Sequence, residues 1–458
     1  MLKEKYTYIP VSKKSDSIPV WFCFPAHYSI GMSSLGYLSL FKILDLNENV
    51  YPERIFADTK KTQHNVHDVE LMGFSNSFEF DFLNIFKILE KYNIPLSSKE
   101  RDEKYPLIFG GGPVLTANPE PFADFFDFII LGDGEEILSE LIEKYKNVKH
   151  LDKNSILLEL ATLEGVYVPS FYEIRYNKDG SIKERITVLP HVPEIIKKRC
   201  TSPLSQCVFS PIVTPDTMFS DTFLIELTRG CPKVCKFCLA SYSNLPTRYP
   251  DKENIITAIR TGMELTGKIG LLGALITEHP DFEEICLYLL NLREKHEFEV
   301  SASSLRADKI TPQMVDMMTK CGQKTLTIAI EAGSERLRNF INKNLSEEQL
   351  FQCVQIASEN GLSGLKLYGM IGLPTETDED IIEFINLLKK LKKINNKFNL
   401  TFSISSFVPK ANTPFQWYGR ENSKSLDKKN NLLKKELHKT GIKFRPTSIN
   451  WDNIQGIL

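Results

Sequence analysis

Three closely spaced cysteines, Cys231, Cys235 and Cys238, are the residues of this chain best suited to chemistry. They follow directly on a short apolar strand candidate, residues 223–227. Three thiolates leave a tetrahedral structural zinc site one ligand short, and the next histidine along the chain is the distant His279. Three thiolates do suit a four-iron cubane with one iron left open, and an open iron is a place for chemistry. A chance cluster or a zinc knuckle is the alternative interpretation.

The residues between and beside these cysteines support the same interpretation. Gly230 and Pro232 would tighten the loop so that the thiolates converge, and Phe237 would help to exclude water from a cluster. An odd total of nine cysteines, without a secretory signal, argues against a disulfide framework. We expect the scattered cysteines to be buried small hydrophobic residues. They are Cys23, Cys200, Cys207, Cys286, Cys321 and Cys353.

Apolar strand candidates alternate with helical patterns in the first third of the chain. The strand candidates end at Phe24, Ser75, Gly112 and Gly132. This alternation is typical of an open parallel sheet, a Rossmann-like α/β fold in which ligands lie at the carboxyl ends of the strands. We therefore predict an α/β domain over residues 1–150.

The remainder of the chain changes character twice. Residues 151–220 are rich in proline and β-branched residues and predict a β-rich connecting segment. From residue 221 to 418 a strand–helix rhythm repeats about six times, which predicts a partial (β/α)6 TIM-type barrel with its active site at the strands' carboxyl ends. Residues 419–458 predict a charged C-terminal extension with a solvated helix.

Composition excludes several classes of protein. The 458 residues carry 56 Lys and Arg against 58 Asp and Glu, a net charge of −2, so no bulk nucleic-acid binding is expected. The sequence contains no run of 18 apolar residues, and its N-terminus lacks the apolar core of a signal peptide. We expect a cytoplasmic protein without a membrane partner.

The C-x-x-x-C-x-φ-C spacing after the first barrel strand resembles the radical S-adenosylmethionine (SAM) superfamily. The resemblance implies that Cys231, Cys235 and Cys238 hold a [4Fe–4S] cluster whose open iron binds SAM. It implies reductive cleavage of SAM to methionine and a 5′-deoxyadenosyl radical, and a low-potential electron donor of flavodoxin or ferredoxin type. The reaction needs a strongly reducing cluster, and protein clusters reach about −700 mV.

The same resemblance implies SAM contacts at the ends of the later strands. Backbone would be exposed to the SAM amino group at Gly273, although Ala274 stands where the family commonly has glutamate. The resemblance also implies contacts with the ribose, the carboxylate and the adenine of SAM at the ends of the next three strands. Each of these positions also has a purely structural interpretation, such as a helix cap or a turn that ends a strand. The implied SAM-binding residues are Phe237, Gly273, Ser303, Ser304, Arg306, Glu331, Ile371, Gly372 and Leu373.

Segments of the front half, above all the glycine- and proline-rich run at residues 110–136, resemble an uncharacterised radical SAM family with a cobalamin (B12)-binding-type N-terminal domain. Cobalamin is therefore a candidate cofactor, and Gly110, Gly111 and Gly112 would admit its nucleotide tail to the backbone. A tight strand exit explains the same glycines equally well. We interpret His67 as a surface histidine, whereas His27 is a candidate ligand contact.

Three functions stay open on the sequence. The first is a radical SAM enzyme, with cobalamin-dependent methyl transfer to an unknown substrate if cobalamin is bound. The second is a cobalamin-free radical SAM enzyme that modifies RNA or protein and uses the N-terminal domain as a docking module. The third is a non-enzymatic iron–sulfur or zinc protein. A methylthiotransferase is disfavoured because Cys23 is the only cysteine before Cys200.

Overall fold

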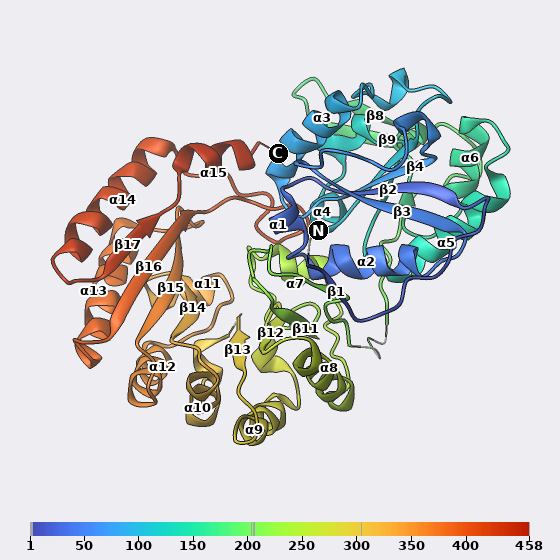
Figure 1. Cartoon of the computed structure of the whole chain (residues 1–458). Helices are drawn as coiled ribbons and strands as arrows, with labels where there is room; N and C mark the ends of the chain where they lie inside the picture. The colour runs from blue at the N-terminus through green and yellow to red at the C-terminus, as the bar shows by residue number, and fades with distance from the viewer. Residues whose placement is uncertain (1–2, 203, 205–206, 304, 458) are drawn as a thin grey trace. The chain divides into compact units, whose positions relative to one another are not determined.

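The computed structural model describes residues 3–202, 204, 207–303 and 305–457. It divides the chain into two compact units, which Figure 1 shows in blue to green and in green to red. The first unit contains the described parts of residues 1–202 and 210–221, and the second those of 203–209 and 222–458. The domain boundaries expected near residues 150, 220 and 418 stay predictions.

A six-stranded sheet forms the centre of the first unit. Five strands are parallel and the sixth, at one edge, is antiparallel. In spatial order they are β3 (Val50–Phe56), β2 (Ile18–Phe24), β4 (Leu71–Ser75), β5 (Leu107–Gly111), β6 (Phe128–Ile130) and β7 (Val166–Tyr167). Numbered along the chain, the parallel strands have the order 2-1-3-4-5 of a flavodoxin-like doubly wound sheet, whose topological switch point lies between β2 and β4.

Both faces of this sheet are covered, which explains why its strands are nearly continuous apolar runs. On β2, Val20 and Phe22 face one hydrophobic core, and Trp21 and Cys23 face the other. The first core is completed by α2 (Leu35–Asp45), α5 (Glu135–Val148) and α6 (Lys153–Leu160), and the second by α3 (Phe82–Lys91) and α4 (Pro113–Ala117). The α/β class expected for this part of the chain is confirmed.

Two features of the first unit differ from the sequence-based expectation. Strand β3 was not foreseen, because Pro52, Glu53 and Arg54 interrupt its apolar pattern; an edge strand tolerates them. The segment expected to be β-rich contains the helix α6 as well as strands. Besides β7, its described strands are β8 (Tyr172–Tyr176) and β9 (Ile182–Thr187), a hairpin that turns at Gly180, and β10 (Ile212–Val213), which pairs with β1 (Lys5–Tyr6).

Parallel strands form an arc in the second unit, with the larger helices on its convex side (Figure 1). The strands form one sheet of β11 (Phe223–Thr228), β12 (Lys268–Gly273) and β13 (Glu299–Ala302), and another of β14 (Thr325–Glu331), β15 (Gly364–Ile371), β16 (Asn399–Ser406) and β17 (Lys443–Pro446). A parallel bridge between Leu305 and Ile328 joins the two sheets. The helices are α8 (Lys252–Leu265), α9 (Phe282–Arg293), α10 (Pro312–Lys320), α12 (Glu347–Glu359), α13 (Asp378–Ile394) and α14 (Ser423–His438).

Buried and partly covered residues alternate along β14, which shows how a barrel strand of this sequence forms. Leu326, Ile328 and Ile330 are buried, whereas Thr327 and Ala329 are only partly covered. This period of two places one apolar face against the helices and leaves the other toward the concave side of the arc. The expected partial barrel is confirmed.

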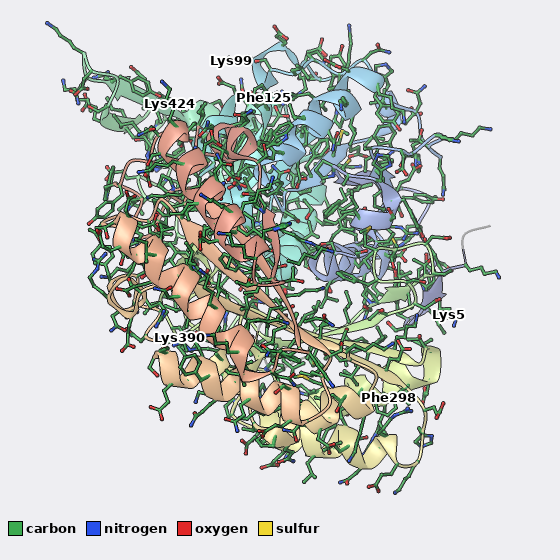
Figure 2. All side chains as sticks on the ribbon, turned by 90° about the vertical axis from the view of Figure 1, so that its left-hand side faces the viewer. Lys5, Lys99, Phe125, Phe298, Lys390 and Lys424 are labelled. Carbon is green, nitrogen blue, oxygen red and sulfur yellow. The ribbon has the colours of Figure 1, made fainter. Side chains whose placement is uncertain are left out.

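Helix α14 and strand β17 extend the arc beyond the six expected repeats. Despite its Lys- and Asn-rich composition, α14 buries Leu426, Leu433 and Leu437, and β17 pairs in parallel with β16. Figure 2 shows this outer helical layer with its side chains, including Lys390 on α13 and Lys424 on α14. None of the described helices is long and apolar enough to cross a membrane.

Candidate metal centre

The three clustered cysteines lie on a tight loop between β11 and the short helix α7 (Leu239–Ser243). The backbone N–H of Cys238 donates to the carbonyl of Cys235 at 3.0 Å, so the last two cysteines share one turn. Cys235 is buried, and Cys231 and Cys238 are partly exposed. All three are free thiols. The loop therefore presents three sulfur atoms at the carboxyl end of the first barrel strand.

A second segment, residues 341–344, holds this loop from the side. It follows the helix α11 (Glu335–Phe340). The Asn342 side-chain amide donates to the carbonyls of Lys233 at 2.9 Å and of Val234 at 3.1 Å. The Cys235 thiol donates to the Asn342 carbonyl at 3.6 Å, and the Lys236 N–H donates to the carbonyl of residue 341 at 3.0 Å. This segment could not be predicted from the sequence, because its residue types carry no signal of such a role.

Charged side chains surround the buried thiol. Burial raises the pKa of Cys235 to about 11, which Lys343 and Arg306 oppose and Glu331 reinforces. Lys343 and Glu331 form an ion pair at 3.1 Å, with both side chains largely buried. The two cationic side chains are therefore placed to favour the thiolate, the form in which cysteine binds metal.

Arg306 contacts the segment of residues 341–344. Its guanidinium donates to the carbonyl of Lys343, and to that of Asn344 at 3.1 Å, and it pairs with Asp308 at 2.7 Å. Its contacts are thus with the protein itself, whereas the resemblance implied that Arg306, with Ser303 and Ser304, contacts the ribose and carboxylate of SAM. Ser303 is exposed in the loop after β13, and Ser304 lies outside the described residues.

Phe237 packs against an apolar cluster at the ends of the later barrel strands. The cluster contains Ala332, Leu337, Ile341, Leu373, Phe407 and Phe415, with Phe340 and Met370 at its margin. The Phe415 N–H also donates to the Lys236 carbonyl at 3.2 Å, so the segment after β16 folds back onto the cysteine loop. This packing covers the side of the loop that carries Phe237, as a water-excluding role requires.

Gly273 lies where β12 ends and pairs in register with Thr228 of β11. A Cβ at this position would lie 2.2 Å from the Thr228 Oγ1, which in turn accepts from the Leu275 N–H at 3.4 Å. The close approach of the two strand ends is enough to require glycine. Exposure of its backbone to SAM stays a prediction.

The expected adenine-binding segment follows β15, and its backbone groups are already bonded within the chain. The Gly372 N–H donates to the Glu376 Oε1 at 2.8 Å, and the Ile371 carbonyl accepts from the Phe407 N–H at 2.8 Å. Leu373 is buried in the apolar cluster described above. Adenine binding by these residues stays a prediction.

The carboxyl ends of the parallel strands bring these residues to one edge of the barrel, as the sequence analysis expected. Glu331 ends β14 with φ of 69°, and Ile371 ends β15 opposite Ser406. His279 offers no fourth ligand, because its Nε2 contacts the Pro250 carbonyl at 2.9 Å and its Nδ1 accepts from the Asp281 N–H. Three thiols without a histidine fit an iron–sulfur cluster with one open iron better than a zinc site.

No group of three or more His, Cys, Asp or Glu side chains within the described part of the chain is arranged to hold a single metal ion.

The glycines proposed for cobalamin lie at the end of β5 in the first unit. A Cβ on Gly110 would overlap Leu115, and one on Gly112, where φ is 105°, would lie 2.4 Å from the Asn76 carbonyl oxygen. Packing alone therefore requires both glycines, whereas Gly111 has room for a Cβ. The buried Asn76 side chain, just after β4, has no hydrogen-bond partner among the described residues.

The two histidines considered for this unit are both exposed. His67 contacts the Lys104 carbonyl at 3.2 Å through its Nδ1. His27 precedes α1 (Tyr28–Gly31) and lies 3.5 Å from the Asp58 carboxylate. The exposure of His67 is that of a surface histidine, as expected, whereas the ligand contact expected for His27 stays a prediction.

Comparison with known proteins gives matches in both units. Residues 225–388 match the model of the radical SAM superfamily, and residues 36–169 match that of the N-terminal region of radical SAM proteins. An uncharacterized protein of Methanocaldococcus jannaschii is 29% identical over 443 residues, 95% of this chain and 87% of the relative.

Two solved structures share the fold. The cobalamin-dependent SAM radical enzyme OxsB, with aqua-cobalamin bound, matches at a TM-score of 0.57 and 19% identity over 82% of this chain, which spans only 52% of the OxsB chain. The radical SAM methyltransferase TsrM of Kitasatospora setae, with cobalamin and a [4Fe–4S] cluster bound, matches at a TM-score of 0.60 and 13% identity over 87% of this chain and 74% of its own. With a family model matched in each of its units, the chain belongs to the radical SAM superfamily.

Proposed function

We propose that this protein is an enzyme that binds a [4Fe–4S] cluster on Cys231, Cys235 and Cys238 and reductively cleaves SAM. Members of the superfamily use these two cofactors. The observation that carries the proposal is the set of three free thiols on one loop, anchored to a second segment at the carboxyl edge of a parallel barrel. An edge of this kind is where barrel enzymes bind their substrates.

The bound cluster would supply one electron to the sulfonium of SAM, which gives methionine and a 5′-deoxyadenosyl radical. The protein's own residues prepare this step. Lys343 and Arg306 favour the thiolate of Cys235, and the packing of Phe237 keeps water from one side of the loop. The electron would come from a low-potential donor of flavodoxin or ferredoxin type.

Anaerobic reconstitution with iron and sulfide, followed by a metal count, tests the cofactor. We expect about four irons per chain, as a [4Fe–4S] cluster requires, and their loss in Cys231→Ala. Cys200→Ala is the matched control, because Cys200 is also partly exposed but lies in the first unit. Stoichiometric zinc in place of iron would overturn the proposal and favour the non-enzymatic alternative.

Formation of 5′-deoxyadenosine tests the chemistry. Reconstituted protein with SAM and dithionite should release 5′-deoxyadenosine and methionine in equal amounts even without substrate. Cys231→Ala should release neither. A cluster that binds but yields no 5′-deoxyadenosine would indicate an iron–sulfur protein without radical chemistry.

We further propose that the first unit binds cobalamin, so that the reaction is a methyl transfer. The 2-1-3-4-5 sheet has its switch point beside β4, where doubly wound sheets bind ligands, and Asn76 leaves a buried amide unsatisfied there. The fold shared with OxsB and TsrM, whose structures contain cobalamin, supports this proposal. No described histidine is needed for it, since a corrinoid can bind without an axial histidine.

Absorption spectroscopy after incubation with hydroxocobalamin and gel filtration tests the second proposal. A corrinoid spectrum that stays with the protein at one equivalent supports methyl transfer. Protein that elutes without corrinoid would contradict it and favour the alternative in which the first unit is a docking module for RNA or protein.

A further inference from the structure

Asn342 makes the most specific contact with the cysteine loop outside the loop itself. Its Nδ2 reaches two consecutive carbonyls, those of Lys233 and Val234, at 2.9 and 3.1 Å. Both carbonyls lie between Cys231 and Cys235. One side chain therefore holds the middle of the loop on which the thiols are mounted, although it follows them by more than one hundred residues.

The orientation of this amide is chemically determined. The Asn344 Nδ2 donates to the Asn342 Oδ1 at 3.0 Å, so the oxygen faces Asn344 and the nitrogen faces the loop. A reversed amide would set its oxygen against two carbonyl oxygens and its nitrogen against another donor. The Nδ2 of Asn342 therefore acts as donor to the loop, and its Oδ1 acts as acceptor for Asn344.

The backbone beneath Asn342 is fixed as well. The N–H groups of Lys343 and Asn344 donate to the Arg338 carbonyl at 2.8 and 3.4 Å, and the carbonyls of the same two residues accept from Arg306. Asn342 itself has φ of 60°, a left-handed conformation that asparagine adopts more readily than most residues. The side chain therefore projects from a rigid platform.

The loop needs such support because its backbone is strained. Val234 has φ of 42°, which is a costly conformation for a β-branched residue. Its carbonyl accepts from Asn342 and from the Tyr242 hydroxyl, the latter at 2.9 Å. These hydrogen bonds offset the strain and keep the turn between the first two cysteines in one shape.

We propose that Asn342 is a positioning residue for the cluster: its amide holds the cysteine loop in the shape that binds iron. The inference rests on the proposed function, because it concerns the same three cysteines. It predicts that loss of the amide weakens iron retention, and alters the electronic signature of the cluster, while the barrel stays folded.

Asn342→Gly isolates the amide, because glycine keeps the left-handed backbone without strain and removes only the side chain. Asn93→Gly is the matched control, since Asn93 is also left-handed, at φ of 55°, but is exposed in the first unit. Asn342→Asp is a second variant that keeps the side-chain shape and its Oδ1 but lacks both N–H donors.

The measurement is the rate at which reconstituted full-length protein loses iron to a chelator under anaerobic conditions, with the EPR spectrum and midpoint potential of the reduced cluster. We expect Asn342→Gly and Asn342→Asp to lose iron about 10- to 100-fold faster than wild type, the range found for partners that orient metal ligands. The EPR spectrum and potential should shift in both, and Asn93→Gly should match wild type. Melting temperatures identify a variant that fails to fold, and Asn342→Asp then carries the test.

The outcomes separate the two proposals. If the wild type binds no cluster, the proposed function fails and this inference fails with it. If the wild type binds a cluster, and both Asn342 variants keep its iron, its EPR spectrum and its potential, the inference alone is overturned, and the asparagine serves only the backbone turn.

Discussion

The thiols of Cys231, Cys235 and Cys238 lie on a loop that the Asn342 side chain holds by two hydrogen bonds. Spacing identified Cys231, Cys235 and Cys238, because three thiolates in one loop have few structural uses. Asn342 contacts backbone carbonyls of that loop, and Arg306 contacts those of residues 343 and 344; any residue supplies such carbonyls. No sequence pattern marks such contacts. Arg306 was therefore identified as a polar residue of the candidate site, but its bonds to other protein groups were not predicted.

The three glycines after β5 show how structure separates packing from a ligand role. We expect Gly112→Ala to destabilise the first unit by at least about 1–3 kcal/mol, because its φ is 105° and the new Cβ would meet the Asn76 carbonyl oxygen. Gly111→Ala should change stability by less than about 1 kcal/mol, since the nearest atom lies 3.6 Å away. Urea unfolding of the two variants measures this contrast.

The same pair of variants tests cobalamin binding. If corrinoid binding depends on backbone access at this strand exit, Gly111→Ala should retain less corrinoid than wild type while it unfolds at the same urea concentration. If Gly111→Ala and Gly112→Ala lose equal stability, the conclusion that packing requires glycine at position 112 but not at 111 is contradicted.

At the scale of elements, apolar runs and helical periodicity located most strands of the six-stranded sheet and of the barrel. Two of the strands that escaped prediction, β3 and β17, lie at sheet edges and carry charged residues and proline within their runs. An edge strand is paired on one side only, so selection for a continuous apolar face is weak there. Helix α14 looked solvated because its three buried leucines are spaced among lysines and asparagines.

Helix α14 is tied to the expected adenine-binding segment by a buried ion pair. The Lys429 Nζ lies 2.7 Å from the Glu376 carboxylate, with exposed side-chain fractions of 6% and 2%, and Glu376 accepts from the Gly372 N–H. We expect Lys429→Met to destabilise the second unit by about 3–5 kcal/mol at pH 7, because Glu376 is then left buried without its cation. Lys428→Met, at an exposed neighbour, should cost less than about 1 kcal/mol.

The pH dependence of Lys429→Met follows from the carboxyl group. Burial raises the pKa of Glu376 above its ordinary value, and Lys429 opposes that rise, so removal of the lysine raises it further. A carboxyl group with a raised pKa is better tolerated in the folded state when protonated. The deficit of the variant should therefore shrink as the pH falls from 7 toward the ordinary pKa of glutamate. Urea unfolding across this range measures it, and Glu376→Gln in the same chain should restore stability at pH 7.

At the scale of the whole molecule, the chain forms two compact units, and a different cofactor is proposed for each. The fold of each was predictable, because strand–helix rhythm distinguishes a doubly wound sheet from a barrel by the number and spacing of its repeats. The division of the chain is more complex, since the described parts of residues 203–209 belong to the second unit and residues 210–221 to the first. The chain therefore passes between the units three times within about twenty residues, and a change of composition near residue 221 cannot show the two earlier crossings.

Hydrogen–deuterium exchange of the full chain tests whether each cofactor acts on its own unit. Reconstitution of the cluster should slow exchange in peptides that cover residues 231–238 and 341–344, because the Lys236 and Cys238 amides belong to hydrogen bonds that a bound cluster would stabilise. Hydroxocobalamin should instead slow exchange near residues 75–77 and 110–113, at the carboxyl ends of β4 and β5. If exchange slows at residues 231–238 but not at residues 341–344, the role of Asn342 is contradicted. A loop cannot be stabilised through contacts with a segment that stays unaffected. Slower exchange in the barrel alone after corrinoid addition would place the corrinoid outside the first unit.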